Sequence, residues 1–280
     1  MIDRDPDLED IRCAFLKYVE SFHSKHGYTC DPEALAKSLG IRVRKGDKGD
    51  CNQAITHPTT GERLILIDET VAPNRFKFTI WHELSHHLFE IAEIDNIQAG
   101  ELPVYLKEHT FKNLETRQKI EDDFCDQAAA TLLIPTPILT EVKNKNGYSP
   151  LAVLELMERT GASAQAALAR LVYSENTNVH GLVIDKMGRV LYSIAHGEKR
   201  EKYPVVSGFK LESNHPLITD KYKPLEEERF EAYIPFKGGT RKWKNKVVAA
   251  ANSNCNRIVA LFLDSYPHKP SPEAIQLSLF

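Results

Sequence analysis

The sequence predicts an α+β chain, with a mostly helical N-terminal part that holds a small sheet and a smaller sheet-containing part after it. Three observations lead to this prediction. Residues 74–91 and 120–135 carry apolar side chains at helical spacing. Between residues 41 and 69, short segments rich in β-branched residues are separated by turn residues. From His180 onward the pattern changes to strands.

The composition is that of an ordinary globular protein of 280 residues, with 42% hydrophobic and 27% charged residues. The net charge is −3, which argues against strong independent DNA binding, because proteins held on DNA by charge are usually basic. The five cysteines are scattered without a CxxC pair, as expected for reduced thiols in the cytoplasm. No apolar run approaches the roughly 20 residues of a membrane span, and the acidic N-terminus is no signal peptide.

The N-terminal half begins with an expected helix over residues 8–26 and a shorter one that starts at Asp31-Pro32 and ends at Gly40. A strand is expected over 41–46, and a hairpin is expected from 51–58 and 62–69. The long helix over 74–91 follows, and residues 94–116 are expected to be irregular.

In the C-terminal half, residues 149–173 are expected to form two helices that divide at Thr160-Gly161, a helix-turn-helix-like pair. Two strands are expected within 180–195, and further strands at 231–236 and 256–264. The proline-punctuated tail after residue 265 is expected to be flexible.

The stretch WHELSHHLFE contains the metal-binding pattern HExxH in His82, Glu83 and His86. Residues four apart share one face of a helix, so both imidazoles can reach one Zn²⁺ at roughly 2.0–2.1 Å. Glu83 lies next to the first ligand and is the candidate general base for an attacking water. His87 points about 100° away from His86 and is expected to be a bystander or to orient a ligand. Glu90, four residues after His86, is expected at the surface, with an orienting carboxylate as the alternative.

A catalytic zinc site needs a third protein ligand, and the acidic start of the 120–135 helix is its best source. Asp122 and Asp126 share a helix face, so one can bind the metal while the other accepts the N–H of a ligand histidine. The alternative is that these acids merely favour a helix N-terminus, and both explanations can hold.

These two helices resemble the ImmA/IrrE metallopeptidases, through NRFKFTIWHELSHHLFE and IEDDFCDQAAATLLIP. The resemblance implies a zinc peptidase of the gluzincin-like type with its third ligand at Asp122, or alternatively at the adjacent Glu121. It places Asp126 behind a ligand histidine. Aspartate at position 122 departs from the glutamate that the family pattern has there.

The resemblance also implies the domain organisation. It gives a zincin-like metallopeptidase domain over 1–140 and the helix-turn-helix-like segment over 141–175. A GAF-like α/β sensor or substrate-binding domain would follow over 176–265, and a flexible tail over 266–280. Apart from the resemblance, Tyr105 and His109 in the 94–116 segment are the candidate donors for stabilising a transition state, and a structural role is the alternative for each.

The chain ends in QLSLF, which resembles the peptide that bacterial proteins insert into the sliding clamp of DNA polymerase. Two apolar anchors and an amide on a flexible leash suit such a pocket. The candidate clamp-binding residues are Gln276, Leu277, Ser278, Leu279 and Phe280. The alternative is a tail that folds back onto the preceding domain.

Together these features predict a cytoplasmic bacterial endopeptidase that uses Zn²⁺, or Mn²⁺ as an alternative. The resemblance implies cleavage of a helix-turn-helix repressor, which would release stress-response, DNA-damage or mobile-element genes. The sliding clamp would be a second partner, and no membrane is involved. Two rivals remain: a non-catalytic adaptor stabilised by its metal, and a toxin or antitoxin partner.

Overall fold

The computed structural model describes residues 8–47, 52–94, 97–109, 114–174, 178–196, 207–219, 222–235 and 244–263. The chain divides into two compact units. The first comprises Met1–Thr140 with Thr160–Ser163, and the second comprises Glu141–Arg159 with Ala164–Phe280. None of the helices in the described ranges combines the length and the apolar character that a bilayer crossing requires.

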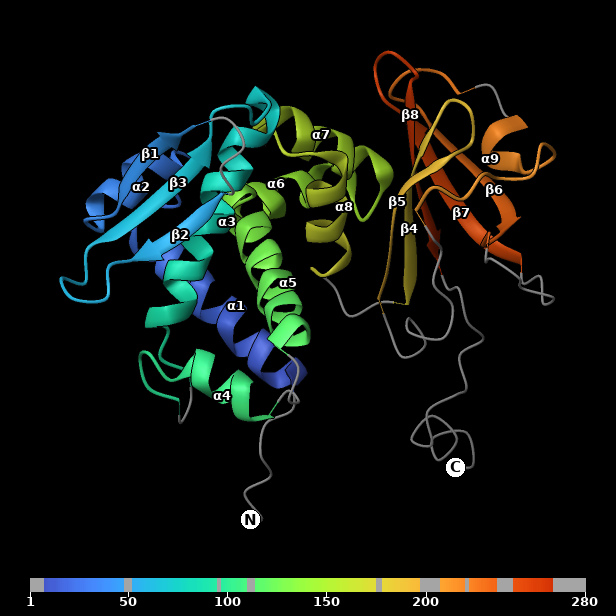
Figure 1. Ribbon diagram of the computed structural model, residues 1–280. Helices are drawn as coiled ribbons and strands as arrows, with labels where there is room; N and C mark the ends of the chain where they lie inside the picture. Colours follow the sequence, from blue (N-terminus) through green and yellow to red (C-terminus); the bar gives the residue numbers. More distant parts are fainter. Residues whose placement is uncertain are drawn as a thin grey trace, which may run out of the picture. The chain divides into compact units, whose positions relative to one another are not determined.

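The first unit opens with two helices, α1 (Leu8–Lys25) and α2 (Pro32–Ser38), as the sequence predicts. Asp31 caps α2 because its Oδ1 accepts hydrogen bonds from the backbone N–H groups of Glu33 and Ala34, at 3.1 Å each. A three-stranded sheet follows in the order β1-β3-β2 (Figure 1). Its strands are β1 (Arg42–Gly46), β2 (Gln53–Thr56) and β3 (Arg63–Asp68).

The expected hairpin is present, because β2 pairs antiparallel with β3 in the register Gln53↔Leu66 to Thr56↔Arg63. The strand β1 pairs parallel with β3, which makes β3 the central strand. This explains why Ile65 and Ile67 of β3 are fully buried.

Two long helices form the centre of the first unit, α3 (Pro73–Ile91) and α5 (Leu114–Leu133). They lie side by side, with α1 against α5 (Figure 1). A fully buried stripe of Trp81, Leu84 and Leu88 holds α3 in the core. The alanine-rich part of α5 permits close approach, since Ala128 and Ala129 are fully buried as well.

The prediction of an irregular segment over 94–116 is wrong, because α4 (Leu102–His109) and the start of α5 lie within it. The glycine and proline of this segment suggested a loop, yet Pro103 stands in the first turn of α4, where a missing N–H costs nothing. The helix α6 (Thr136–Asn146), which begins directly after Pro135, was also not predicted.

The helices α7 (Pro150–Thr160) and α8 (Ala164–Val172) belong to the second unit except for Thr160, and the chain changes direction between them at Gly161, whose φ is +70°. The predicted division at Thr160-Gly161 is therefore present. The helix α8 packs against β4 and β5. It buries its apolar face of Ala164, Ala166, Ala167, Leu168, Leu171 and Val172.

A five-stranded antiparallel sheet completes the second unit, in the order β5-β4-β8-β7-β6 (Figure 1). Its strands are β4 (Val179–Asp185), β5 (Val190–His196), β6 (Glu227–Tyr233), β7 (Lys244–Ala251) and β8 (Arg257–Leu263), with the short helix α9 (Pro216–Thr219) between β5 and β6. The turn between β4 and β5 contains Gly188 at a φ of +75°, between the two strands expected within 180–195.

Both faces of this sheet are covered. On one face, Gly181 of β4 lies so close to α8 that a Cβ atom there would stand 2.8 Å from Cδ1 of Leu168. On the other face the apolar core includes Leu182, Leu217 and Phe262. The strand β7 was not predicted, because its run of three alanines favours a helix by propensity, although small side chains also suit a central, covered strand.

Candidate metal centre

The helix α3 brings His82, Glu83 and His86 to its surface beside α5, while its opposite face is buried. The fully buried indole of Trp81 fixes the rotation of the helix at this point. Each of the two histidine side chains is 20% exposed, which leaves an edge of each ring open to solvent.

The helix α5 meets this pair with carboxylates. Nδ1 of His82 lies 2.8 Å from Oδ1 of Asp126, and Nδ1 of His86 lies 3.0 Å from Oε1 of Glu121. A carboxylate only accepts hydrogen bonds, so each Nδ1 donates its N–H and each Nε2 is left with a lone pair. Because His82 meets the later acid and His86 the earlier one, α3 and α5 run in opposite directions.

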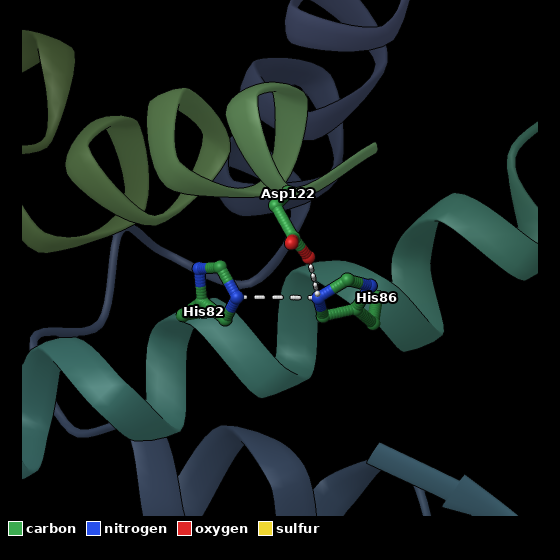
Figure 2. Close-up of side chains that lie close together, drawn as sticks. All are labelled: His82, His86 and Asp122. Atoms are coloured by element: carbon green, nitrogen blue, oxygen red, sulfur yellow. Dashed lines mark hydrogen bonds and ion pairs between the residues drawn. The ribbon is translucent and has the colours of Figure 1, made fainter. Parts of the chain in front are cut away.

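The two Nε2 atoms face one another at 3.2 Å, and Oδ1 of Asp122 lies 3.5 Å from Nε2 of His86 (Figure 2). These three atoms lie within 4.8 Å of one another. Two ligands of a tetrahedral zinc, each at about 2.0–2.1 Å, stand about 3.4 Å apart. Three acceptor atoms that converge without a donor repel one another unless a cation lies between them, so the donor set fits a divalent metal.

The geometry favours Asp122 over Glu121 as the third ligand. Asp122 points at the Nε2 atoms, whereas Glu121 is held on the far nitrogen of His86. Asp126 accepts the hydrogen bond from Nδ1 of His82 and so orients that ring. This is one of the two roles expected for Asp126 from the sequence. Ligation by these residues stays a prediction.

Glu83 is 6% exposed and lies against the sheet as well as the histidine pair. Burial raises the pKa of its carboxyl, and the nearby His82 and His86 and a hydrogen bond from the backbone of Ala54 in β2 counteract part of this rise. A carboxyl with a raised pKa beside a metal site suits a group that accepts and returns a proton.

The pKa of His86 is shifted by opposing effects. Burial lowers it, but the hydrogen bond and negative charge of Glu121, together with the charges of Glu83 and Asp122, outweigh burial, so the net pKa is raised. The negative charges that raise the pKa of His86 would also stabilise a bound cation, because both effects favour positive charge at this site.

Cys125 lies on α5 close to these acids but is fully buried. Burial, reinforced by the negative charges of Glu121 and Asp122, raises the pKa of its thiol well above the ordinary value. It therefore stays a neutral thiol and is not a candidate ligand.

His87 and Glu90 connect α3 to the sheet. His87 is 1% exposed, its Nε2 lies 3.2 Å from the carbonyl oxygen of Leu64 in β3, and its Nδ1 lies 3.8 Å from Oε2 of Glu90. Glu90 accepts a hydrogen bond from Oγ1 of Thr56 at 2.9 Å. Glu90 is 47% exposed, as expected of a surface residue, and it also links α3 to β2 through Thr56. The sequence holds no local signal for this link, because Thr56 comes from the preceding sheet.

The remaining predicted site residues are less closely defined. Tyr105 lies on α4, which packs against α3 and α5, and its role in stabilising a transition state stays a prediction. His109 ends α4, and its side chain is outside the described part. The tail residues 276–280 also lie outside the described residues.

Comparisons with known proteins point to the same region. Residues 36–172 match the model of the Peptidase M78 family, described as the IrrE N-terminal-like domain. The radiation response metalloprotease IrrE of Deinococcus radiodurans is 27% identical over 204 residues, which are 66% of this chain and 59% of that protein. IrrE of Deinococcus deserti is 25% identical over 202 residues, 64% of each chain. The chain thus spans less than two thirds of either relative's length.

A solved structure described as a Mycobacterium tuberculosis transcriptional regulator is similar in fold, with a TM-score of 0.54. The similarity covers 91% of this chain and 81% of that chain, at 14% sequence identity. At this identity the likeness concerns the fold alone.

Proposed function

Residues 36–172 of this chain belong to the IrrE N-terminal-like domain family, and we propose that the protein is a regulatory zinc-dependent endopeptidase. One observation carries the proposal: the Nε2 atoms of His82 and His86 and Oδ1 of Asp122 converge as acceptors beside a buried Glu83. A purely structural metal needs a fourth protein ligand, and it has no use for a base next to it. The non-catalytic adaptor therefore has less support.

In the proposed mechanism, His82, His86 and Asp122 would hold the metal. A zinc ion there would supply Lewis acidity and make a water nucleophile accessible at neutral pH. Glu83 takes a proton from the attacking water and passes it to the leaving amine. Its burial keeps competing water away from the carboxylate, and Glu121 and Asp126 hold the imidazoles in place.

The position of β2 supports a peptide as substrate. This strand lies at the edge of the three-stranded sheet, and its Ala54 contacts Glu83 while its Thr56 contacts Glu90. The edge strand β2 therefore runs alongside α3 from Glu83, next to the histidine pair, to Glu90. An extended peptide added to β2 by backbone hydrogen bonds would have its scissile bond beside Glu83.

We propose a helix-turn-helix repressor as the substrate class, so that cleavage releases genes of a stress or DNA-damage response. The support is the family match together with the two Deinococcus relatives, which are radiation response metalloproteases. The second unit, in the GAF-like role proposed for it, would sense a signal or hold the repressor; an antiparallel sheet with helices on both faces supports a separate module.

The test is incubation of the full chain with repressors encoded beside it, with Zn²⁺ or Mn²⁺, and identification of fragments by mass spectrometry. Metal-dependent fragments that Glu83→Gln does not produce support the proposal. Intact repressors at saturating metal, with both metals, contradict it.

We also propose that the QLSLF tail binds the sliding clamp in the bacterial cytoplasm. The support is the sequence itself, with apolar Leu279 and Phe280 after Gln276 at the end of a proline-containing stretch. A chain that lacks residues 276–280 should lose clamp capture and keep cleavage of free repressor. Capture that persists without these residues contradicts the tail proposal alone.

A further inference from the structure

The helix α5 presents three carboxylates to two histidines, and the three have different positions. Asp122 points at the Nε2 atoms, Asp126 accepts from Nδ1 of His82, and Glu121 accepts from Nδ1 of His86. We infer that Glu121 is the principal positioning residue of the site: it fixes the ring and the tautomer of His86 and so sets the metal affinity. The inference rests on the metal site of the proposed function.

The two nitrogens of an imidazole have different roles in metal binding. A neutral histidine carries one N–H, and only the other nitrogen has the lone pair that a metal needs. Oε1 of Glu121 lies 3.0 Å from Nδ1 of His86, so the proton is held on Nδ1 and the lone pair of Nε2 is directed at the metal position. Without Glu121 the ring is free to rotate or to carry its proton on Nε2, and neither state binds metal well.

Because it is more buried, Glu121 should contribute more to metal binding than Asp126, the acid that holds the other histidine. The side chain of Glu121 is 24% exposed, whereas that of Asp126 is 55% exposed. Water competes for the Asp126 oxygens and screens their charge, while a hydrogen bond to a shielded carboxylate is stronger. The loss of Glu121 should therefore weaken metal binding more than the loss of Asp126, although Asp126 makes the shorter hydrogen bond.

Side-chain length also fits this division. Glu121 and Asp122 are adjacent, so their side chains leave α5 about 100° apart. The shorter Asp122 ends near Nε2 of His86, and the longer Glu121 passes to the far side of the same ring, at Nδ1. Glu121 and Asp122 thus contact opposite edges of the His86 ring. The longer side chain reaches the far nitrogen Nδ1, and the shorter one reaches the near nitrogen Nε2.

The test measures zinc affinity by competition with a chromogenic chelator, on the full chain. Glu121→Ala should bind zinc about 10–100-fold more weakly than the wild type, the range typical of carboxylates behind a ligand histidine. Glu121→Gln keeps an acceptor oxygen and should recover part of that loss. Asp126→Ala should lose less than Glu121→Ala, and Asp123→Ala, an exposed acid on the same helix, is the control that should match the wild type.

The absorption spectrum of the Co²⁺-loaded protein separates positioning from ligation. Glu121→Ala should keep the d–d band positions of the wild type at saturating Co²⁺, whereas Asp122→Ala should shift them because a ligand is lost. Thermal melts of the metal-free variants show whether each one folds. If Glu121→Ala binds zinc as tightly as the wild type, or shifts the Co²⁺ bands as Asp122→Ala does, the positioning role is overturned. A wild type that binds zinc through these residues yet cleaves no repressor overturns the proposed function and leaves the role of Glu121 standing.

Discussion

Nε2 of His82 and Nε2 of His86 face one another at 3.2 Å, while the Nδ1 atom of each ring is held by a carboxylate from α5. In the neutral rings two lone pairs would repel at this distance, and a cation or a proton between them removes the repulsion. The outer edges of the two imidazoles contact Asp126 and Glu121, and the inner edges are the proposed place of the metal.

Loss of the third ligand should weaken metal binding strongly. Asp122→Ala removes the oxygen that lies 3.5 Å from Nε2 of His86, and we expect at least about a 100-fold loss of zinc affinity, beyond the effect of an outer carboxylate. Chelator competition measures this loss. An unchanged affinity would show that another group completes the site.

Replacement of the base should separate chemistry from binding. Glu83→Gln keeps the shape of the side chain but cannot accept the proton, so we expect kcat to fall at least about 100-fold while zinc affinity stays within a few-fold of the wild type. Multiple-turnover cleavage at saturating repressor measures kcat, and chelator competition measures the zinc affinity. Normal cleavage by this variant excludes Glu83 as the base.

Zinc should stabilise the folded chain. A metal that binds only the native state at about 100 times its Kd adds about 2.7 kcal/mol to the free energy of unfolding. We expect zinc to raise the Tm of the wild type and to raise that of His86→Ala little or not at all. Calorimetry measures both Tm values. An equal rise in both proteins would place the stabilising metal elsewhere.

The contact between Gly181 and Leu168 should limit substitution in β4. A Cβ atom at position 181 would stand 2.8 Å from Cδ1 of Leu168, so Gly181→Val should lower the free energy of unfolding by about 1–3 kcal/mol through overpacking. Chemical denaturation measures the change. In the Leu168→Ala background the cost of Gly181→Val should shrink, and equal costs in both backgrounds would contradict the contact.

His215 should make stability fall in acid. Its Nδ1 accepts from the N–H of Leu217 at 3.2 Å and its Nε2 donates to the carbonyl oxygen of Tyr233 at 2.9 Å, so the folded chain requires the neutral ring. Burial lowers the pKa of His215 below its ordinary value of 6.5, despite the opposing hydrogen bond to Tyr233 and the charge of Glu212. Above about pH 6.5 neither state binds this proton, and as the pH falls below that value the unfolded state binds it first, so stability is lost.

The measurement for His215 is denaturation at about pH 7.5 and about pH 5.0, on either side of the ordinary histidine pKa. The variant His215→Asn cannot titrate, but its amide oxygen can still accept from the N–H of Leu217. It should therefore lose less stability between these two pH values than the wild type does. An identical loss in both proteins would show that other groups cause the acid sensitivity.

The sequence alone was sufficient for features that depend on local spacing. The four-residue step from His82 to His86 places both rings on one helix face whatever surrounds it, and the turn residues before Arg63 are enough for the β2–β3 hairpin. Gly161 likewise marks the break between α7 and α8, because a left-handed φ favours glycine.

Only the tertiary structure decided which acid of α5 faces the Nε2 atoms and which acid holds a histidine ring at Nδ1. Glu121 and Asp122 differ by one step of about 100° around the same helix, so a small rotation of α5 would exchange their places, and no local pattern fixes that rotation. The packing of α5 against α3 fixes it, by placing Phe124 and Ala128 in the core and leaving Asp122 directed at Nε2 of His86. Adjacent acids such as Glu121 and Asp122 have nearly equal intrinsic preferences for either role. The buried apolar residues around them determine the direction in which each carboxylate points.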